Sequence, residues 1–239
     1  MTATIMTTKT RTTNSNVRRV PDRAVLVPFE AEAPLDCPLC PRLVAYREAN
    51  DAAHPDWFNA PVPSFGDRNA RLLVVGLAPG VQGANRTGRP FTGDFAGDLL
   101  YGTLLEFGFA RGTYEARPDD GLALTGAMIA NAVRCVPPQN KPTPAEAKNC
   151  LGFLKARIGA LPDLEIILAL GRIAHDAVLS ARGVKKSAAP FAHGAEHNLG
   201  SGLRLFDSYH CSRYNTNTRR LTPEMFRSVF AEIRKRIDG

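Results

Sequence analysis

The sequence predicts an α/β fold, a three-layer α/β/α sandwich with a central, mainly parallel four-stranded sheet. Four short apolar segments alternate along the chain with segments of helical periodicity, and this alternation produces parallel sheets covered by helices on both faces. The chain has 239 residues, of which 44% are hydrophobic and 22% charged. This length and composition are sufficient for a sizeable core.

The N-terminal end differs in composition from the rest. Residues 1–23 are rich in threonine and carry five basic residues against one acidic residue, a net charge of +4, whereas the whole chain carries +7. We predict a disordered basic tail over residues 1–30, in preference to a transit peptide of similar composition, and a single domain over residues 31–239. No apolar run is long enough to span a bilayer. We therefore expect a soluble, cytoplasmic protein without membrane contact, whose positive charge suits a polyanionic partner.

The elements of the first half are predicted from short patterns. Residues 40–50, CPRLVAYREAN, read as a short helix, and residues 71–77, RLLVVGL, as a buried strand because they are continuously apolar and end at glycine. Residues 95–109 carry leucines at helical spacing. Residues 126–134, GAMIANAVR, predict the second buried strand.

The second half continues the alternation. Thr143-Pro-Ala-Glu146 is a capping box with proline at the first helical position, so a helix is expected from there to about residue 160. Residues 164–170 and 203–208 predict the third and fourth strands, and residues 171–182 the helix between them. A final helix begins after Thr222 and presents one apolar face, made of Phe226, Val229, Phe230 and Ile233.

Parallel sheets bind ligands beyond the carboxyl ends of their strands. Four connections leave those ends here: residues 76–97, residues 134–142, the turn at Gly171 and residues 208–220. The first, second and fourth hold most of the unusual polar residues of the chain. The topology alone therefore predicts the location of the site.

The first connection, GLAPGVQGANRTGRPFTGDFAG, has neither the Gly-Lys-Ser/Thr ending of a phosphate-binding loop nor a GxGxxG fingerprint, which argues against nucleoside triphosphate hydrolysis. It contains Phe91 and Asp94, which could stack a planar ring and orient a water molecule. The alternatives are a core aromatic for Phe91 and a helix N-cap for Asp94. The fourth connection interleaves amides and guanidinium groups with tyrosine, a composition suited to phosphate contacts and base stacking, although an exposed polar loop would look the same.

Four of the five cysteines form a candidate metal centre. Cys37 and Cys40 are separated by two residues, and Cys135 and Cys150 follow far downstream. Four thiolates suit zinc or an iron–sulfur cluster, and the spacing does not choose between them. The alternative is a set of unrelated buried thiols. Cys211 is interpreted as a packing residue.

Six motifs, in order, resemble the uracil-DNA glycosylase superfamily and most closely its family 5. They are CPLCPRLVAYRE, GLAPGVQGANRTGRPFTGDFAG, AVRCVPPQNKPTP, ALGRIAHDAV, FAHG and SYHCSRYNTNTRRLT. The resemblance covers the chain from about Cys37 to the C-terminus. It implies a monomeric, monofunctional glycosylase that flips uracil out of double-stranded DNA, with single-stranded DNA as a further substrate. It also implies that Cys37, Cys40, Cys135 and Cys150 hold a [4Fe–4S] cluster.

The resemblance further implies a role for each site residue. Asp94, Asn140 and His210 would be catalytic: Asp94 positions water and stabilises the cationic sugar, and His210 donates to the uracil O2. Residues around the base would be Gly76, Ala78, Pro79, Gly80, Phe91 and Asn131. Residues on the DNA would be Arg86, Ser212, Arg213, Asn215 and Arg219, with the loop up to Arg220 entering the minor groove.

Two positions bear on the comparison with other branches of the superfamily: Ala78 departs from them, whereas Asn131 agrees with them and differs from some family 5 sequences, which have a small residue there. Ala78 stands where those branches carry a catalytic polar residue, which would move the work to Asp94. Asn131 would read the O4 and N3–H edge of uracil and disfavour cytosine. The alternatives are a family 4 enzyme, disfavoured because Leu77 replaces a glutamate, and a catalytically silent DNA-binding protein on the same scaffold. A zinc hydrolase is disfavoured because no His/Asp/Glu set has ligand spacing.

Overall fold

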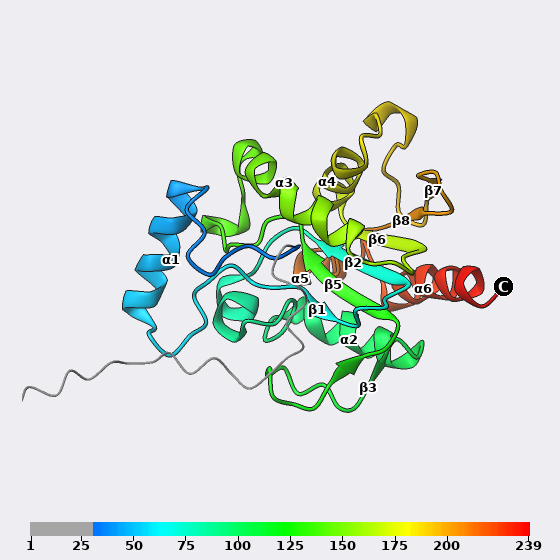
Figure 1. Cartoon of the computed structure of the whole chain (residues 1–239). Coiled ribbons are helices and arrows are strands. Elements are labelled where there is room, and N and C mark those ends of the chain that lie inside the picture. Colours follow the sequence, from blue (N-terminus) through cyan, green and yellow to red (C-terminus); the bar gives the residue numbers. More distant parts are fainter. Residues whose placement is uncertain (1–30) are drawn as a thin grey trace, which may run out of the picture.

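A six-stranded sheet forms the centre of the computed structural model, which describes residues 31–239. The predicted tail over residues 1–30 lies outside the described residues. The strand order is β1-β5-β2-β6-β8-β7 (Figure 1). The four predicted strands are confirmed as its parallel part: β2 (Leu72–Gly76), β5 (Ala127–Asn131), β6 (Ile166–Leu170) and β8 (Arg204–Ser208).

Short antiparallel strands, which the sequence patterns did not predict, extend both edges. These are β1 (Phe65–Gly66), paired with β5, and β7 (Glu196–Asn198), paired with β8. A separate two-stranded ribbon joins β3 (Ala110–Arg111) to β4 (Ala123–Leu124). The sheet is therefore mainly parallel, with an antiparallel strand at each edge.

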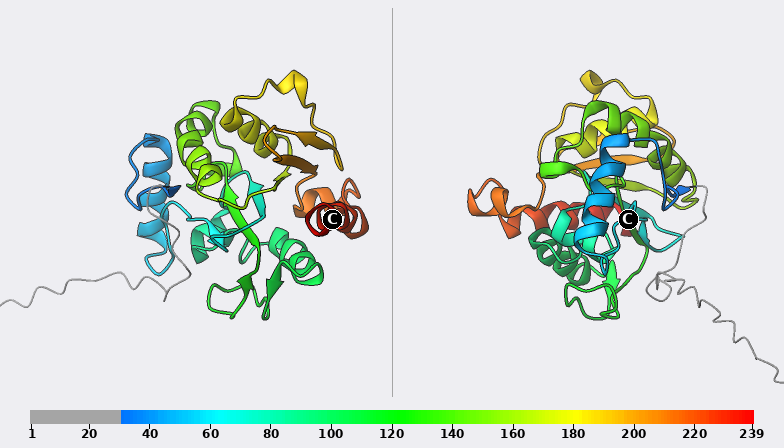
Figure 2. Two further views of the ribbon diagram at one scale, coloured as in Figure 1. Left: turned by 45° about the vertical axis from the view of Figure 1, so that its right-hand side comes forward. Right: turned by 90° about the vertical axis from the view of Figure 1, so that its left-hand side faces the viewer.

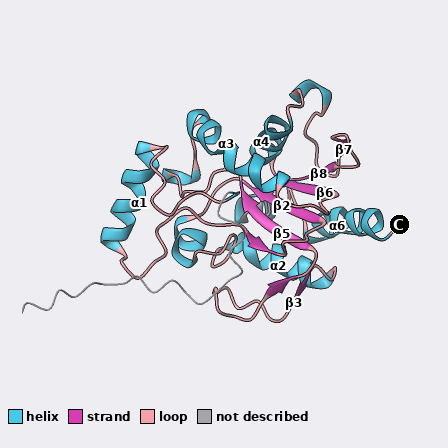
Figure 3. Ribbon diagram, in the orientation of Figure 1, coloured by secondary structure: helices cyan, strands magenta, loops and turns pink. Residues whose placement is uncertain are grey.

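Helices cover both faces of the sheet, as Figure 3 shows in cyan around magenta. The helices α2 (Phe95–Glu106) and α6 (Pro223–Asp238) pack on one face, and α3 (Pro144–Gly159) and α4 (Arg172–Arg182) pack on the other. This confirms the three-layer sandwich. At one end of the molecule lies α1 (Pro41–Ala53), opposite α6 (Figures 1 and 2). Within residues 31–239, no helix is both long and apolar enough to cross a membrane.

The apolar runs of the central strands follow from burial on both faces. In β2, Leu72 and Val74 point into the core beneath α2 and α6, whereas Leu73 and Val75 point into the core beneath α3 and α4. Successive side chains of a strand alternate between faces, so a strand covered on both sides reads as continuously apolar.

A buried carboxylate fixes the strand that leads into the last connection. Asp207 of β8 has one oxygen 2.7 Å from His175 Nδ1 on α4 and the other 3.2 Å from His197 Nε2 on β7. The remaining nitrogen of His175 is 2.9 Å from the Ala189 carbonyl oxygen. Burial raises the pKa of Asp207, and the hydrogen bonds from both histidines oppose that rise. This network holds α4 and β7 to β8, three residues before His210.

The registers bring the ends of the parallel strands together. Gly76, the last residue of β2, pairs with Asn131, the last residue of β5. Leu170, the last residue of β6, pairs with Ser208, the last of β8. All four connections named from the sequence therefore leave one edge of the sheet.

The N-cap of α6 allows a test of this packing. The Thr222 hydroxyl accepts a hydrogen bond from the Met225 N–H, 3.2 Å away, and α6 packs beside α2 on one face of the sheet. Thr222→Ala is expected to lower the free energy of unfolding by about 1 kcal/mol, the usual value of such a cap. Urea unfolding followed by circular dichroism measures it. Thr113→Ala, at an exposed position, is the control and should leave the midpoint unchanged.

Candidate active site

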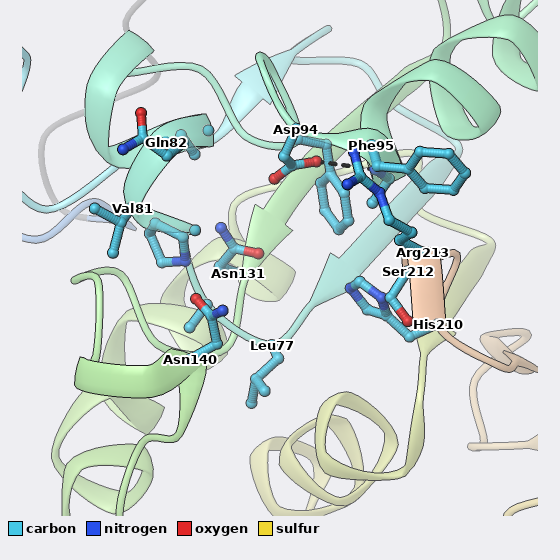
Figure 4. A pocket seen from close by; sticks show the side chains of 17 residues that line it. Leu77, Val81, Gln82, Asp94, Phe95, Asn131, Asn140, His210, Ser212 and Arg213 are labelled. Carbon is cyan, nitrogen blue, oxygen red and sulfur yellow. Dashed lines mark hydrogen bonds between the residues drawn. The ribbon is translucent and has the colours of Figure 1, made fainter. Parts of the chain in front are cut away.

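A pocket of about 500 Å³ opens at the carboxyl ends of β2 and β5 (Figure 4). Its walls come from the connection after β2, the N-terminus of α2, the turn at residues 138–140 and the connection after β8. The predicted site residues that line it are Ala78, Pro79, Gly80, Phe91, Asp94, Asn131, Asn140, His210, Ser212 and Arg213. Sequence positions more than a hundred residues apart therefore meet in one cavity.

Asp94 is the N-cap of α2 and also a wall of the pocket. Its Oδ1 accepts hydrogen bonds from the N–H groups of Ala96 and Gly97, at 3.1 and 3.2 Å. Burial raises the pKa of the Asp94 carboxyl, and these two backbone hydrogen bonds oppose the rise. The helix cap that the sequence offered as the alternative is thus present. It fixes the carboxylate through Oδ1, and Oδ2 has no hydrogen-bond partner within residues 31–239.

Gly83 explains how Asp94 can approach the connection after β2 so closely. A Cβ atom at Gly83 would lie 2.5 Å from Asp94 Oδ2 and 3.0 Å from Asp94 Cγ. Since real Cβ contacts are never that short, only glycine leaves room for the carboxylate here. Gly83 was not among the predicted site residues, although the glycine-rich composition of this connection was the signal.

Phe91 forms part of the pocket wall while packing against the core. Its side chain is 6% exposed, it belongs to the core cluster beneath α2, and its φ of 56° is left-handed. The ring lies 5.9 Å from the His210 ring, at 28° to it. A Cβ at Gly76 would lie 2.6 Å from Phe91 Cζ, so the last residue of β2 must be glycine for the ring to stand there.

The guanidinium of Arg89 packs among aromatic rings, two of which form hydrogen bonds to the backbone at Pro90 and Phe91. The sequence analysis did not identify this arrangement. Arg89 pairs with Asp120 through two hydrogen bonds of 2.8 and 2.7 Å, and the Arg89 guanidinium lies 5.2 to 5.7 Å from the rings of Phe65, Tyr101 and Tyr114. Tyr101 and Tyr114 donate hydrogen bonds to the carbonyls of Pro90 and Phe91, respectively.

The ion pair behind Phe91 is stable in its charged form. Burial alone would raise the pKa of Asp120, but hydrogen bonds from Arg89 and from two backbone N–H groups bring it down to about 2. The left-handed backbone at Phe91 is therefore held by phenolic hydrogen bonds from Tyr101 and Tyr114, and the charge-assisted Arg89–Asp120 pair packs against those two rings.

Two asparagines face the pocket from neighbouring elements. Asn131 is 2% exposed, and its Oδ1 is buried with no hydrogen-bond partner in the part of the chain that the structure describes. Because a buried amide oxygen without a partner is costly, it is suited to accept a hydrogen bond from a ligand. Asn140 ends a turn in which it and Gln139 both have left-handed backbones, each with a φ of 56°.

His210 is neutral in the folded protein. Burial lowers the pKa of its imidazole to about 4. A neutral ring can donate one hydrogen bond and carries no charge into the pocket. Asn215 donates a 2.7 Å hydrogen bond to the His210 carbonyl and so fixes the backbone at this position.

The predicted DNA-binding residues are dispersed around the rim. The Ser212 hydroxyl caps the short helix α5 (Arg213–Asn217), and the Arg213 guanidinium lies 5.3 Å from the ring of the exposed Phe95. Gly76 lies behind Phe91, whereas Arg86, Asn215 and Arg219 do not line the cavity. Lining residues that the sequence analysis did not single out are Leu77, Val81, Gln82, Gly83, Ala84, Phe95 and Ala96.

Cys37, Cys40, Cys135 and Cys150 line one small buried cavity between α1 and α3. Three nitrogen donors approach their sulfur atoms: Arg47 Nη1 to Cys135 Sγ at 3.4 Å, the Arg134 N–H to Cys150 Sγ at 3.3 Å, and Asn149 Nδ2 to Cys40 Sγ at 3.6 Å. Cys211 lies elsewhere, fully buried in the core beneath α2. The structure thus brings together the four cysteines that the sequence analysis grouped as one candidate metal centre.

The fold and the pocket agree with comparisons to known proteins. A sequence model of the uracil DNA glycosylase superfamily matches residues 63–234, which contain all the residues that line the pocket. The chain is 50% identical over 209 residues to the type-5 uracil-DNA glycosylase of Thermus thermophilus, covering 85% of this chain and 94% of that protein. The chain therefore belongs to the uracil DNA glycosylase superfamily, and within it to the type-5 group.

Other relatives support this placement. The type-5 uracil-DNA glycosylase of Mycobacterium bovis is 41% identical over 207 residues, covering 83% of this chain and 77% of that protein. The type-4 uracil-DNA glycosylase of Sulfurisphaera tokodaii is 29% identical over 174 residues, covering 70% of this chain and 72% of that protein. The type-4 alternative is thus only a distant one.

Gly83 provides a test of the geometry around Asp94. Gly83→Ala is expected to displace the Asp94 carboxylate and to slow the release of uracil from duplex DNA about a hundredfold, since small misplacements of a reacting group cost this much. Gly102→Ala is the matched control, because a Cβ there meets nothing within 4 Å. It should retain activity and, lying within α2, should stabilise the protein. Equal rates for both variants would contradict the placement of Asp94.

Proposed function

We propose that this protein is a monofunctional uracil-DNA glycosylase of base excision repair, which flips uracil out of double-stranded DNA and hydrolyses its N-glycosidic bond. The observation that carries the proposal is the position of Asp94: one carboxylate oxygen caps α2, and the carboxylate lines the same pocket as Asn131, whose amide oxygen has no hydrogen-bond partner within residues 31–239. Type-5 uracil-DNA glycosylases up to 50% identical support the same reaction.

The pocket residues divide the binding of uracil among them. The flipped base stacks on Phe91, and Asn131 pairs with its O4 and N3–H edge, which satisfies the unpartnered Asn131 Oδ1. Cytosine presents an amino donor where uracil presents O4, so the same amide disfavours it. The walls formed by Gly76, Ala78, Pro79 and Gly80 let the backbone approach the base closely.

The departure of the base is assisted by charge. As the glycosidic bond breaks, positive charge develops on the sugar, and the Asp94 carboxylate stabilises it and orients the attacking water with help from Asn140. Negative charge develops on uracil, and neutral His210 donates a hydrogen bond to O2. None of the described lining residues is a lysine, so the product is an abasic site with an intact strand.

The alternative function is a catalytically silent DNA-binding protein on the same scaffold. Both candidates share the DNA surface, which we assign to Arg86, Ser212, Arg213, Asn215 and Arg219. They differ in whether the pocket performs chemistry. The combination of Asp94, Asn140 and His210 around one cavity favours the enzyme. We further propose that residues 31–239 act as one domain, that the protein is a cytoplasmic monomer and that single-stranded DNA is also accepted.

The cysteine cavity fits a [4Fe–4S] cluster. Soft thiolates suit iron–sulfur clusters, and N–H donors to the sulfurs are the usual means of tuning them. Within residues 31–239, the one group of three ligand atoms all within 4.8 Å of one another is His175, His197 and Asp207, so no three of the four cysteine sulfurs lie that close to one another. A tetrahedral zinc site would hold its thiolates about 3.8 Å apart. The cluster would hold the segment before α1 against the segment between Cys135 and Cys150, which includes the first turns of α3.

The first prediction from this proposal concerns Asp94. Asp94→Asn is expected to reduce uracil excision at least a hundredfold, because the charge that stabilises the sugar is lost. Asp98→Asn is the matched control, since Asp98 is exposed one turn along the same helix. Single-turnover assays on a uracil-containing duplex measure both. A wild-type protein that releases no uracil would instead support the silent DNA-binding protein.

The pH dependence follows from the raised pKa of Asp94. Activity requires the carboxylate, so the rate should fall as the pH is lowered through a value above 3.8, the ordinary pKa of the group. The charge of Asp98 contributes to the rise. Asp98→Asn should therefore move the acid limb of the single-turnover profile to lower pH, and a shift in the opposite direction would contradict this assignment.

Asn131 is tested by comparing two ligands. Asn131→Ala is expected to slow uracil excision about tenfold to a hundredfold, as expected for a lost bidentate amide–base contact. Its affinity for a duplex that contains an abasic site should not change, because that ligand has no base to contact. An equal loss of affinity for the abasic duplex would show that Asn131 acts on the DNA backbone or on the fold.

A further inference from the structure

Two histidines and an aspartate from three different elements converge near the β7 edge of the sheet (Figure 1). His175 lies on α4, His197 on β7 and Asp207 on β8. Each offers one ligand atom, an imidazole nitrogen or a carboxylate oxygen, and these three atoms all lie within 4.8 Å of one another. Because the three residues come from separate elements, no spacing in the sequence identifies them as a set.

The hydrogen bonds of His175 do not balance for a neutral ring beside a carboxylate. Its Nε2 is 2.9 Å from the Ala189 carbonyl oxygen, which can only accept, so Nε2 carries a hydrogen atom. In a neutral ring Nδ1 then has a lone pair, and it lies 2.7 Å from Asp207 Oδ1, which also has lone pairs. Two lone pairs at this distance repel each other unless a further proton or a metal ion lies between them.

The charge of Asp207 also calls for a cation. The residue is 0% exposed, and within residues 31–239 its ion-pair partners are His175 and His197, with no lysine or arginine among them. A buried carboxylate is costly unless it is paired with a positive charge or coordinates a metal. A divalent cation among the three side chains would supply that charge.

The geometry favours a metal ion over a further proton, because three ligand atoms converge instead of two. His197 Nε2 lies 3.2 Å from Asp207 Oδ2. Bonds of about 2.0 to 2.1 Å at tetrahedral angles place the ligands of zinc about 3.3 Å apart, so only the 2.7 Å contact of His175 has to widen. The hydrogen bond from His175 Nε2 to a backbone carbonyl is the usual support of a metal-bound imidazole, since it fixes the tautomer.

We propose that His175 Nδ1, His197 Nε2 and the Asp207 carboxylate bind a structural zinc ion, with a water molecule in the fourth position. Imidazole and carboxylate are ligands that suit zinc. Since His175 and Asp207 are 1% and 0% exposed, a substrate does not reach the ion, and its role is to clamp α4 and β7 to β8. The ion enters past His197, whose side chain is 13% exposed. The site is separate from the cysteine cavity.

The first experiment measures zinc binding through stability. Wild type, His197→Gln and His54→Gln are treated with a chelator under conditions that leave their iron content unchanged, and are then melted at increasing zinc concentrations. Glutamine retains an N–H donor for Asp207 Oδ2 but loses the imidazole ligand, so it preserves the hydrogen bond and removes the zinc site. His54 is exposed and outside the set, so His54→Gln is the matched control.

Wild type and His54→Gln should show a Tm that rises with zinc, because a ligand that binds only the folded state stabilises it. His197→Gln should need at least about a hundredfold more zinc for the same rise, since the loss of a mere supporting hydrogen bond already weakens metal binding about tenfold to a hundredfold. Equal responses of wild type and His197→Gln would overturn the proposal. A wild type whose Tm ignores zinc would also overturn it and leave a shared proton between His175 and Asp207.

The second experiment identifies the ligands. X-ray absorption at the zinc edge separates nitrogen and oxygen ligands, at about 2.0 to 2.2 Å, from sulfur at about 2.3 Å. Wild type should show a shell of nitrogen and oxygen with imidazole scattering that His197→Gln lacks. A sulfur shell without imidazole, equal in both variants, would place the zinc at the cysteines and overturn the proposal. Neither experiment involves DNA, so the outcome does not depend on whether the protein excises uracil.

Discussion

The two oxygens of one carboxylate connect the fold of this protein to its chemistry. Asp94 Oδ1 caps α2, and because α2 packs on the sheet, the cap fixes the carboxylate relative to the strands. Oδ2 is directed to the turn at Gly83, where no Cβ fits. The position of this proposed catalytic carboxylate therefore depends on the formation of α2 and on its packing against the sheet.

Much of the fold could be predicted because a strand that is buried on both faces has a continuously apolar sequence. The four parallel strands read as continuous apolar runs, and Thr143 and Thr222 marked helix starts that the structure confirms. The edge strands β1 and β7 were missed because two or three residues, only partly buried, carry no periodicity. The single-domain assignment and the basic tail stay predictions.

The site residues that follow the ends of strands could be predicted from the sequence. The contacts between residues far apart in the sequence that hold these site residues in place could not. Phe91, Asp94 and Asn131 lie in or beside the glycine-rich connection and the end of β5. The Arg89–Asp120 pair could not be predicted, because its two residues are 31 positions apart and no local sequence pattern connects them. For Phe91, the sequence offered two interpretations, a core aromatic and a ring that stacks on a ligand. The structure does not separate them, because the ring packs on the core and also lines the pocket.

The order of the strands explains why the polar residues of the chain gather where they do. Parallel strands β5, β2, β6 and β8 present four carboxyl ends in a row. The inner connections can be lengthened without disturbing the sheet, and each adds one wall to a shared groove. His210, fixed through the Asp207 network below and the Asn215 bond above, stands between the ends of two strand pairs. The His210 ring thus separates the proposed base pocket from a second cavity lined by Arg172 and Arg220.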